Sequence, residues 1–92
     1  MEYKYKVMPT PPGETILELA HSKGMEFFEL MEASDLTIED LNKIIEGKAV
    51  ITKEIAERLE SALGVPAQFF LNLEKNFRES LYNLYDEIRT GN

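Results

Sequence analysis

The sequence predicts an all-α protein with one small domain. Three observations predict this fold class. Apolar residues recur at steps of three and four from residue 14 onward, and this spacing is typical of one face of a helix. Single glycines follow these stretches, where a left-handed residue often ends a helix. The 92 residues are 43% apolar, which is enough for one modest core.

The first 13 residues are predicted to form an arm that precedes the domain of residues 14–92. Residues 2–7 alternate so that Tyr3, Tyr5 and Val7 share one face, which is the period of a short strand. The stretch "MPTPPG" that follows favours extended backbone, because proline lacks an N–H donor and has a fixed φ. A single strand is not stable alone. This segment therefore either pairs as a strand or remains an extended arm.

Four short helices are predicted between residues 14 and 64, in "GETILELAHSKG", "EFFELMEAS", "TIEDLNKIIEG" and "TKEIAERLESALG". Thr37 and Thr52 are expected to cap the third and fourth helices, since a threonine hydroxyl accepts a hydrogen bond from an otherwise unpaired N–H group. The residues predicted to face the core are Ile16, Leu17, Ala20, Phe27 or Phe28, Leu30, Met31, Leu41, Ile44, Ile45, Ile55, Ala56, Leu59 and Leu63.

A fifth, longer helix is predicted from Pro66 to about Arg89. One apolar stripe runs along it, formed by Phe70, Leu73, Phe77, Leu81, Leu84 and Ile88. A helix of this length measures about 36 Å, more than four short helices cover. We therefore expect its distal part, with Tyr82 and Tyr85 beside the stripe, to pack on a second copy or on another protein.

Catalytic and metal-binding constellations are not apparent in the sequence. The chain contains no cysteine, and its single histidine, His21, is expected to be exposed. The serines have no recognisable base nearby, and the glycines stand singly rather than in a phosphate-binding loop. The start has no signal-peptide pattern, and no apolar run is long enough for a membrane span. We expect a cytoplasmic protein that is not an enzyme and has no catalytic, cofactor-binding or metal site.

The second and third predicted helices are joined by only "SDL", which is the layout of a helix-turn-helix. The segments "PPGE", "GM", "EGK", "IT", "ALG" and "FFLNL" occur in order between residues 11 and 77. Together they resemble the XRE-type helix-turn-helix family, and within it the branch of HigA-like antitoxins. Similar segments also open longer proteins with a zinc-peptidase domain. A piece of such a longer protein is therefore a further interpretation.

The resemblance implies a five-helix, lambda-repressor-like DNA-binding domain that is usually a homodimer through its C-terminal part. In this family the third helix enters the major groove, where Thr37, Ile38, Glu39 and Lys43 would stand at the N-terminal edge. Phosphates are typically met near the start of the second helix, at Glu26 and Phe27, and after the third helix, at Glu46 and Lys48. The predicted DNA-binding residues are Thr37, Ile38, Glu39, Asn42, Lys43, Lys48 and Lys53.

The charge distribution opposes this interpretation. The net charge is −7, and residues 24–48 contain seven carboxylates against two lysines. Carboxylates near phosphates weaken binding, because counterion release by cations supplies much of the affinity for DNA. Glu26, Glu39 and Asp40 have an ordinary explanation, since acids in a first turn complement the helix dipole. Glu39 also has a specific use, because a carboxylate accepts a hydrogen bond from cytosine N4.

The sequence thus leads to two functional hypotheses. The first is a sequence-specific, DNA-binding transcriptional regulator, a HigA-like antitoxin that autoregulates its operon by binding operator DNA and neutralises a small basic toxin. The alternative is an acidic protein-binding helix-turn-helix module that has weak or lost DNA binding, since a negative surface suits a basic partner. A fold does not decide between them.

Overall fold

The computed structural model describes residues 9–89. Within this range the chain forms five helices and no strand, which confirms the all-α prediction. The strand expected at residues 2–7, and most of the N-terminal arm with it, lie outside the described residues. The helices are α1 (Pro12–Ser22), α2 (Phe27–Ser34), α3 (Ile38–Ile45), α4 (Lys53–Leu63) and α5 (Ala67–Arg89).

The ends of the helices follow local signals in the sequence. Thr37 Oγ1 accepts a hydrogen bond from the N–H of Asp40 at 3.0 Å, and Thr52 Oγ1 accepts one from Ile55 at 3.3 Å. Both predicted caps are therefore present. The glycines after α1, α3 and α4 all adopt positive φ, as expected for helix-terminating residues. α1 begins at Pro12 rather than at Glu14, because a proline in the first turn needs no N–H partner.

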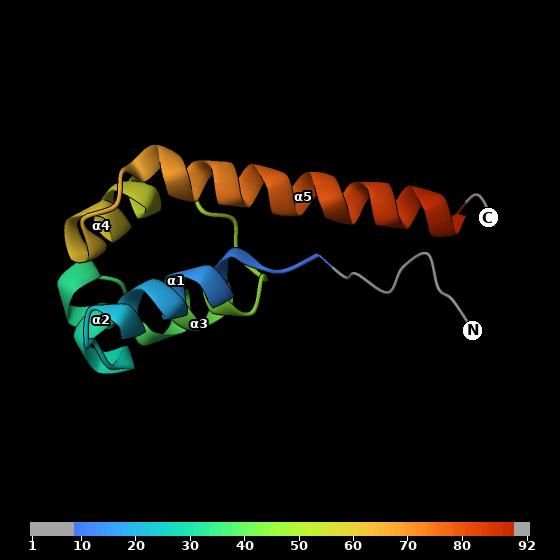
Figure 1. Ribbon diagram of the computed structural model, residues 1–92. Helices are drawn as coiled ribbons and strands as arrows, with labels where there is room; N and C mark the ends of the chain where they lie inside the picture. The colour runs from blue at the N-terminus through green and yellow to red at the C-terminus, as the bar shows by residue number, and fades with distance from the viewer. Residues whose placement is uncertain (1–8, 90–92) are drawn as a thin grey trace.

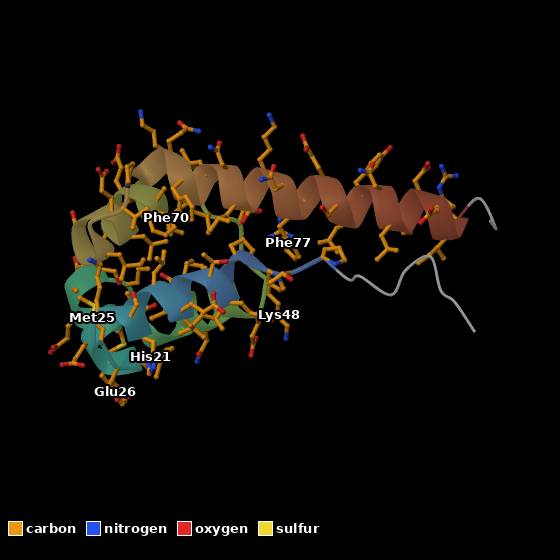
Figure 2. The ribbon with its side chains drawn as sticks, viewed as in Figure 1. His21, Met25, Glu26, Lys48, Phe70 and Phe77 are labelled. Carbon is orange, nitrogen blue, oxygen red and sulfur yellow. The ribbon has the colours of Figure 1, made fainter. Side chains whose placement is uncertain are left out.

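The helices are arranged around one core (Figure 1). α1 packs against α3, α5 and α2, while α4 packs against α5 and α2. The largest buried side chain is Phe70 of α5, which points into this core (Figure 2). The other large apolar side chains that are fully buried are Ile16, Leu30, Leu41, Ile44, Ile51, Leu59 and Leu63.

The structure corrects one residue of the predicted core and decides one alternative that the sequence left open. Leu17 was expected to face inward but is 37% exposed, because Ile16 and Ala20 occupy the face of α1 that meets the other helices. In α2 the half-buried Phe27 packs against the core and Phe28 is exposed, which decides between the two candidates. Leu36, in the turn after α2, is buried although it belongs to no helical stripe.

α5 has a packed half and a projecting half. Phe70 and Phe77 are buried, whereas Tyr82, Tyr85 and Ile88 are exposed by 69%, 63% and 56%. The distal turns extend beyond the other four helices (Figure 1), and the molecule measures 45 Å along its longest axis against 26 and 23 Å across. The apolar stripe therefore serves the core over its first half and faces away from the described core at its end.

Candidate nucleic-acid interface

α2 and α3 are joined by a tight three-residue turn. Its first residue, Asp35, has a φ of 59°, a left-handed conformation that aspartate tolerates better than most residues. The second residue, Leu36, inserts into the core, and the third, Thr37, caps α3. Each residue of the turn thus has a distinct structural role, and together they determine the direction in which α3 leaves α2.

A side chain from α4 holds this turn in place. Arg58 Nη1 donates hydrogen bonds to the backbone carbonyl of Asp35 at 2.8 Å and to its carboxylate at 3.1 Å. The other amino group, Nη2, donates to Glu54 on the preceding turn of α4 at 3.1 Å. Since the guanidinium fork fixes several donors in one plane, Arg58 ties the α2–α3 turn to α4.

α3 presents one face to the core and the other to solvent. Leu41 and Ile44 are buried, while Ile38, Glu39, Asn42 and Lys43 are exposed, as is the cap Thr37. At about 100° per residue these four helical positions span an arc of about 140°, and Asp40, which is also exposed, extends it to about 200°. Five of the predicted DNA-binding residues therefore share one continuous surface.

The two remaining predicted residues lie outside α3. Lys48 follows α3 in the connection to α4 (Figure 2), and its backbone N–H donates to the carbonyl of Lys43 at 2.7 Å. Its ammonium lies 3.5 Å from the Glu46 carboxylate. Lys53 is exposed at the first position of α4 and makes no ion pair with another described residue. A cation at the start of a helix is unfavourable with the helix dipole. Because Lys53 also has no ion-pair partner among the described residues, it is available to an anionic partner.

Several acidic residues of this region have structural roles. The N–H of Glu26 donates to Glu29 Oε1 at 2.7 Å, so that these residues stabilise the start of α2. Glu39 and Asp40 lie in the first turn of α3, Asp35 pairs with Arg58, and Glu46 lies beside Lys48. The pairing of Glu46 is the unfavourable one for phosphate binding, because it partly neutralises one of the few cations near α3.

Three charged side chains bind the backbone segments before and after α3, a contact that the sequence does not predict. Besides Arg58, these are Glu74 and Arg78, one turn apart on α5. Glu74 is buried and accepts from the N–H of Ile51 at 3.1 Å. Arg78 pairs with Glu74 and reaches the carbonyls of the α3–α4 connection. Glu54 and Arg58, like Glu74 and Arg78, are four residues apart, and this spacing is a sequence signal for an ion pair on a helix. It does not reveal that the arginines and Glu74 also contact a distant segment of the backbone.

The described residues hold no group of three or more histidine, cysteine, aspartate or glutamate side chains arranged to hold a metal ion. His21 is exposed on α1, on the side of the molecule away from α5 (Figure 2). In the same part of the chain, no helix has the length and apolar character required to cross a membrane.

No protein-family model matches the chain, and no curated protein matches its sequence significantly.

Proposed function

We propose that this chain is a sequence-specific DNA-binding transcriptional regulator of the XRE helix-turn-helix type. The observation that carries the proposal is the exposed face of α3, on which Thr37, Ile38, Glu39, Asn42 and Lys43 stand together. A helix whose outer face carries hydrogen-bonding side chains, and which follows a second helix across a tight turn, fits the arrangement of a recognition helix in the major groove.

The exposed residues of α3 and the two lysines that follow it would make different kinds of contact with DNA. The amide of Asn42 suits the N6 and N7 edge of adenine, the ammonium of Lys43 suits guanine, and the carboxylate of Glu39 suits the N4 amino group of cytosine. Lys48, in the connection between α3 and α4, and Lys53, at the start of α4, would supply cations for phosphates. Base contacts of this kind give specificity, and phosphate contacts give orientation and affinity.

The distal half of α5 supports a homodimer as the binding unit. Tyr82, Tyr85 and Ile88 form an exposed apolar surface that a second α5 would cover. A symmetric dimer would bind an operator with two-fold symmetry, whose half-sites are about one helical turn, or a multiple of it, apart.

Within this proposal, the chain acts as a HigA-like antitoxin that represses its own operon and neutralises a small basic toxin. The net charge of −7 supports a cationic partner, because opposite surface charges accelerate association and favour correct pairing. A gene for a small basic protein beside this one would favour the antitoxin role over that of a simple repressor.

A second candidate is a protein-binding module with the same fold and no use of DNA. The observation in its favour is the number of exposed carboxylates, with Glu26 before α2, Glu29 and Glu32 on α2, and Glu39 and Asp40 in the first turn of α3. These carboxylates would face the phosphates if α3 entered the groove. A basic protein would meet the same surface without that repulsion.

One experiment separates the two candidates. The purified protein is titrated with a duplex from its own upstream region, and with a scrambled duplex of equal length, at two salt concentrations. We expect selective binding to the upstream duplex that weakens as salt rises, since phosphate contacts release counterions. An absence of binding at low salt, where phosphate contacts are strongest, would exclude the DNA-binding function and leave the protein-binding module.

A further inference from the structure

Glu74 of α5 is a buried carboxylate, and each of its two oxygens has a hydrogen-bond partner. The residue is 6% exposed, and a buried charge is costly unless it is paired and hydrogen-bonded. Its Oε1 accepts from the N–H of Ile51 at 3.1 Å, and its Oε2 accepts from Arg78 Nε. Both oxygens are thus used, one for the ion pair within α5 and one for the chain segment that enters α4.

Arg78 continues the same set of contacts. Its Nη2 donates to the carbonyl of Ala49 at 3.3 Å and reaches that of Gly47 at 3.5 Å, while the guanidinium lies 5.0 Å from the ring centroid of Phe77. Together, Glu74 and Arg78 bind the backbone of the connection between α3 and α4 at residues 47, 49 and 51. We call these two side chains and their contacts the α5 tether.

The tether determines which side chains of the connection face outward. Residues 47, 49 and 51 are bound to α5, whereas Lys48 and Val50 between them are exposed, with 73% of the Lys48 side chain accessible. Gly47 strengthens this arrangement, because a Cβ at this position would stand 3.3 Å from both the Phe77 ring and Pro11. Alternate residues are therefore turned toward α5 and toward solvent.

We propose that Glu74 and Arg78 are positioning residues of the DNA interface, which hold Lys48 beside the exposed face of α3 so that its ammonium meets a phosphate. This inference rests on the proposed DNA-binding function and adds a role for two residues that would not touch DNA themselves. A lysine on an untethered connection would lose more freedom on binding, and its contact would contribute less affinity.

The test is a double-mutant cycle on affinity for the upstream duplex. Lys48→Met removes the phosphate contact, Arg78→Met removes most of the tether, and the double variant carries both changes. If the tether acts through Lys48, Arg78→Met weakens binding at least about fivefold in the parent chain and less than about twofold in the Lys48→Met chain. Additive effects of the two substitutions would overturn the inference.

Two control variants separate positioning from charge and stability. Arg89→Met removes the same charge from α5 and also breaks an ion pair, with Asp86 at 2.8 Å, but Arg89 makes no contact with the connection. It is expected to change DNA affinity less than about twofold. Arg78→Lys keeps the charge and loses the guanidinium fork, so that a positioning role predicts a loss of affinity close to that of Arg78→Met. Full recovery by lysine would contradict it.

Hydrogen exchange of the free protein tests the α5 tether in the absence of DNA. The amide of Ile51 should exchange faster in Glu74→Leu and Arg78→Met, while core amides such as that of Leu59 stay protected. An unchanged Ile51 amide would overturn the inference even where DNA binding is intact. Failure of the parent chain to bind any duplex would instead overturn the proposed function, and the role in DNA binding with it.

Discussion

Arg58 on α4 and Asp35 in the α2–α3 turn form a contact between residues 23 positions apart, in which one guanidinium nitrogen binds both the carbonyl and the carboxylate of Asp35. Hydrogen bonds to Glu54 and to Asp35 raise the pKa of Arg58 above its ordinary value. The contact secures the one non-glycine residue with positive φ among those described.

Replacement of Arg58 should loosen the α2–α3 turn. We expect Arg58→Ala to lower the midpoint of thermal unfolding more than Arg89→Ala, because Arg58 binds a backbone carbonyl of another element, whereas the partner of Arg89 among the described residues is Asp86 of its own helix. Arg58→Lys should recover part of the loss. Circular dichroism measures the midpoints, and equal shifts for the two alanine variants would show that the contact with the turn adds nothing.

Substitutions of Asp35 should depend on their tolerance of left-handed backbone. Asp35→Ala is expected to destabilise the protein by about 1 kcal/mol, because alanine tolerates the left-handed conformation less well than aspartate. Asp35→Asn removes the same ion pair but tolerates the backbone, so that its loss should be smaller. Urea unfolding compares the two variants. Equal losses for asparagine and alanine would assign the importance of this position to charge instead.

Gly13 should not tolerate even a methyl group. A Cβ at this position would lie 2.2 Å from Cα of Ile45 and 2.5 Å from its carbonyl oxygen, so that α1 and α3 must move apart. We expect Gly13→Ala to destabilise by about 2 kcal/mol, a typical cost of overpacking. Gly24→Ala is the control, since its Cβ meets nothing within 4 Å and only the positive φ opposes it. An unfolding free energy of Gly13→Ala equal to that of the parent chain would refute the close approach.

Removal of two acids near α3 should strengthen DNA binding. Glu39→Gln removes a negative charge from the exposed face, and Glu46→Asn also frees Lys48 from its partner at 3.5 Å. The double variant is expected to bind the upstream duplex at least about fivefold more tightly, with a steeper dependence on salt. Glu60→Gln, on the exposed side of α4, controls for net charge. If neither the parent chain nor the double variant binds any duplex, α3 has only a structural role in the fold.

The exposed end of α5 should mediate dimerisation. We expect the parent chain to sediment as a dimer and the variant with both Tyr82→Ser and Tyr85→Ser to sediment as a monomer, because stable interfaces bury about 800 Å² per partner around apolar anchors. Phe28→Ser, at another exposed aromatic residue, should leave the dimer intact. A parent chain that remains monomeric at high concentration would refute this assignment.

The helices themselves could be predicted from the sequence because their signals are local. Thr37 and Thr52 are caps whatever the rest of the chain does, and Gly47 ends α3 because it readily adopts positive φ. The exposed face of α3 was also predictable, since it follows from the positions of Leu41 and Ile44 within one helical period.

Other features required the packed structure. Leu17 and Phe28 have neighbours on the helix that are just as apolar, so that only the positions of the other helices decide which side chain is buried. The contacts of Arg58 with Asp35, and of Arg78 with Gly47 and Ala49, join residues 23 to 31 positions apart. The sequence shows the charges, but only the fold determines their partners.

The sequence by itself therefore determined the presence and order of the helices, the two threonine caps and the outward face of α3, because each depends on residues within one or two turns of each other. The tertiary structure decided how that face is held. Arg58 restrains the turn before α3, and Glu74 and Arg78 restrain the segment after it. These contacts exist only after α4 and α5 have packed, since packing is what brings distant backbone carbonyls within reach of a guanidinium group.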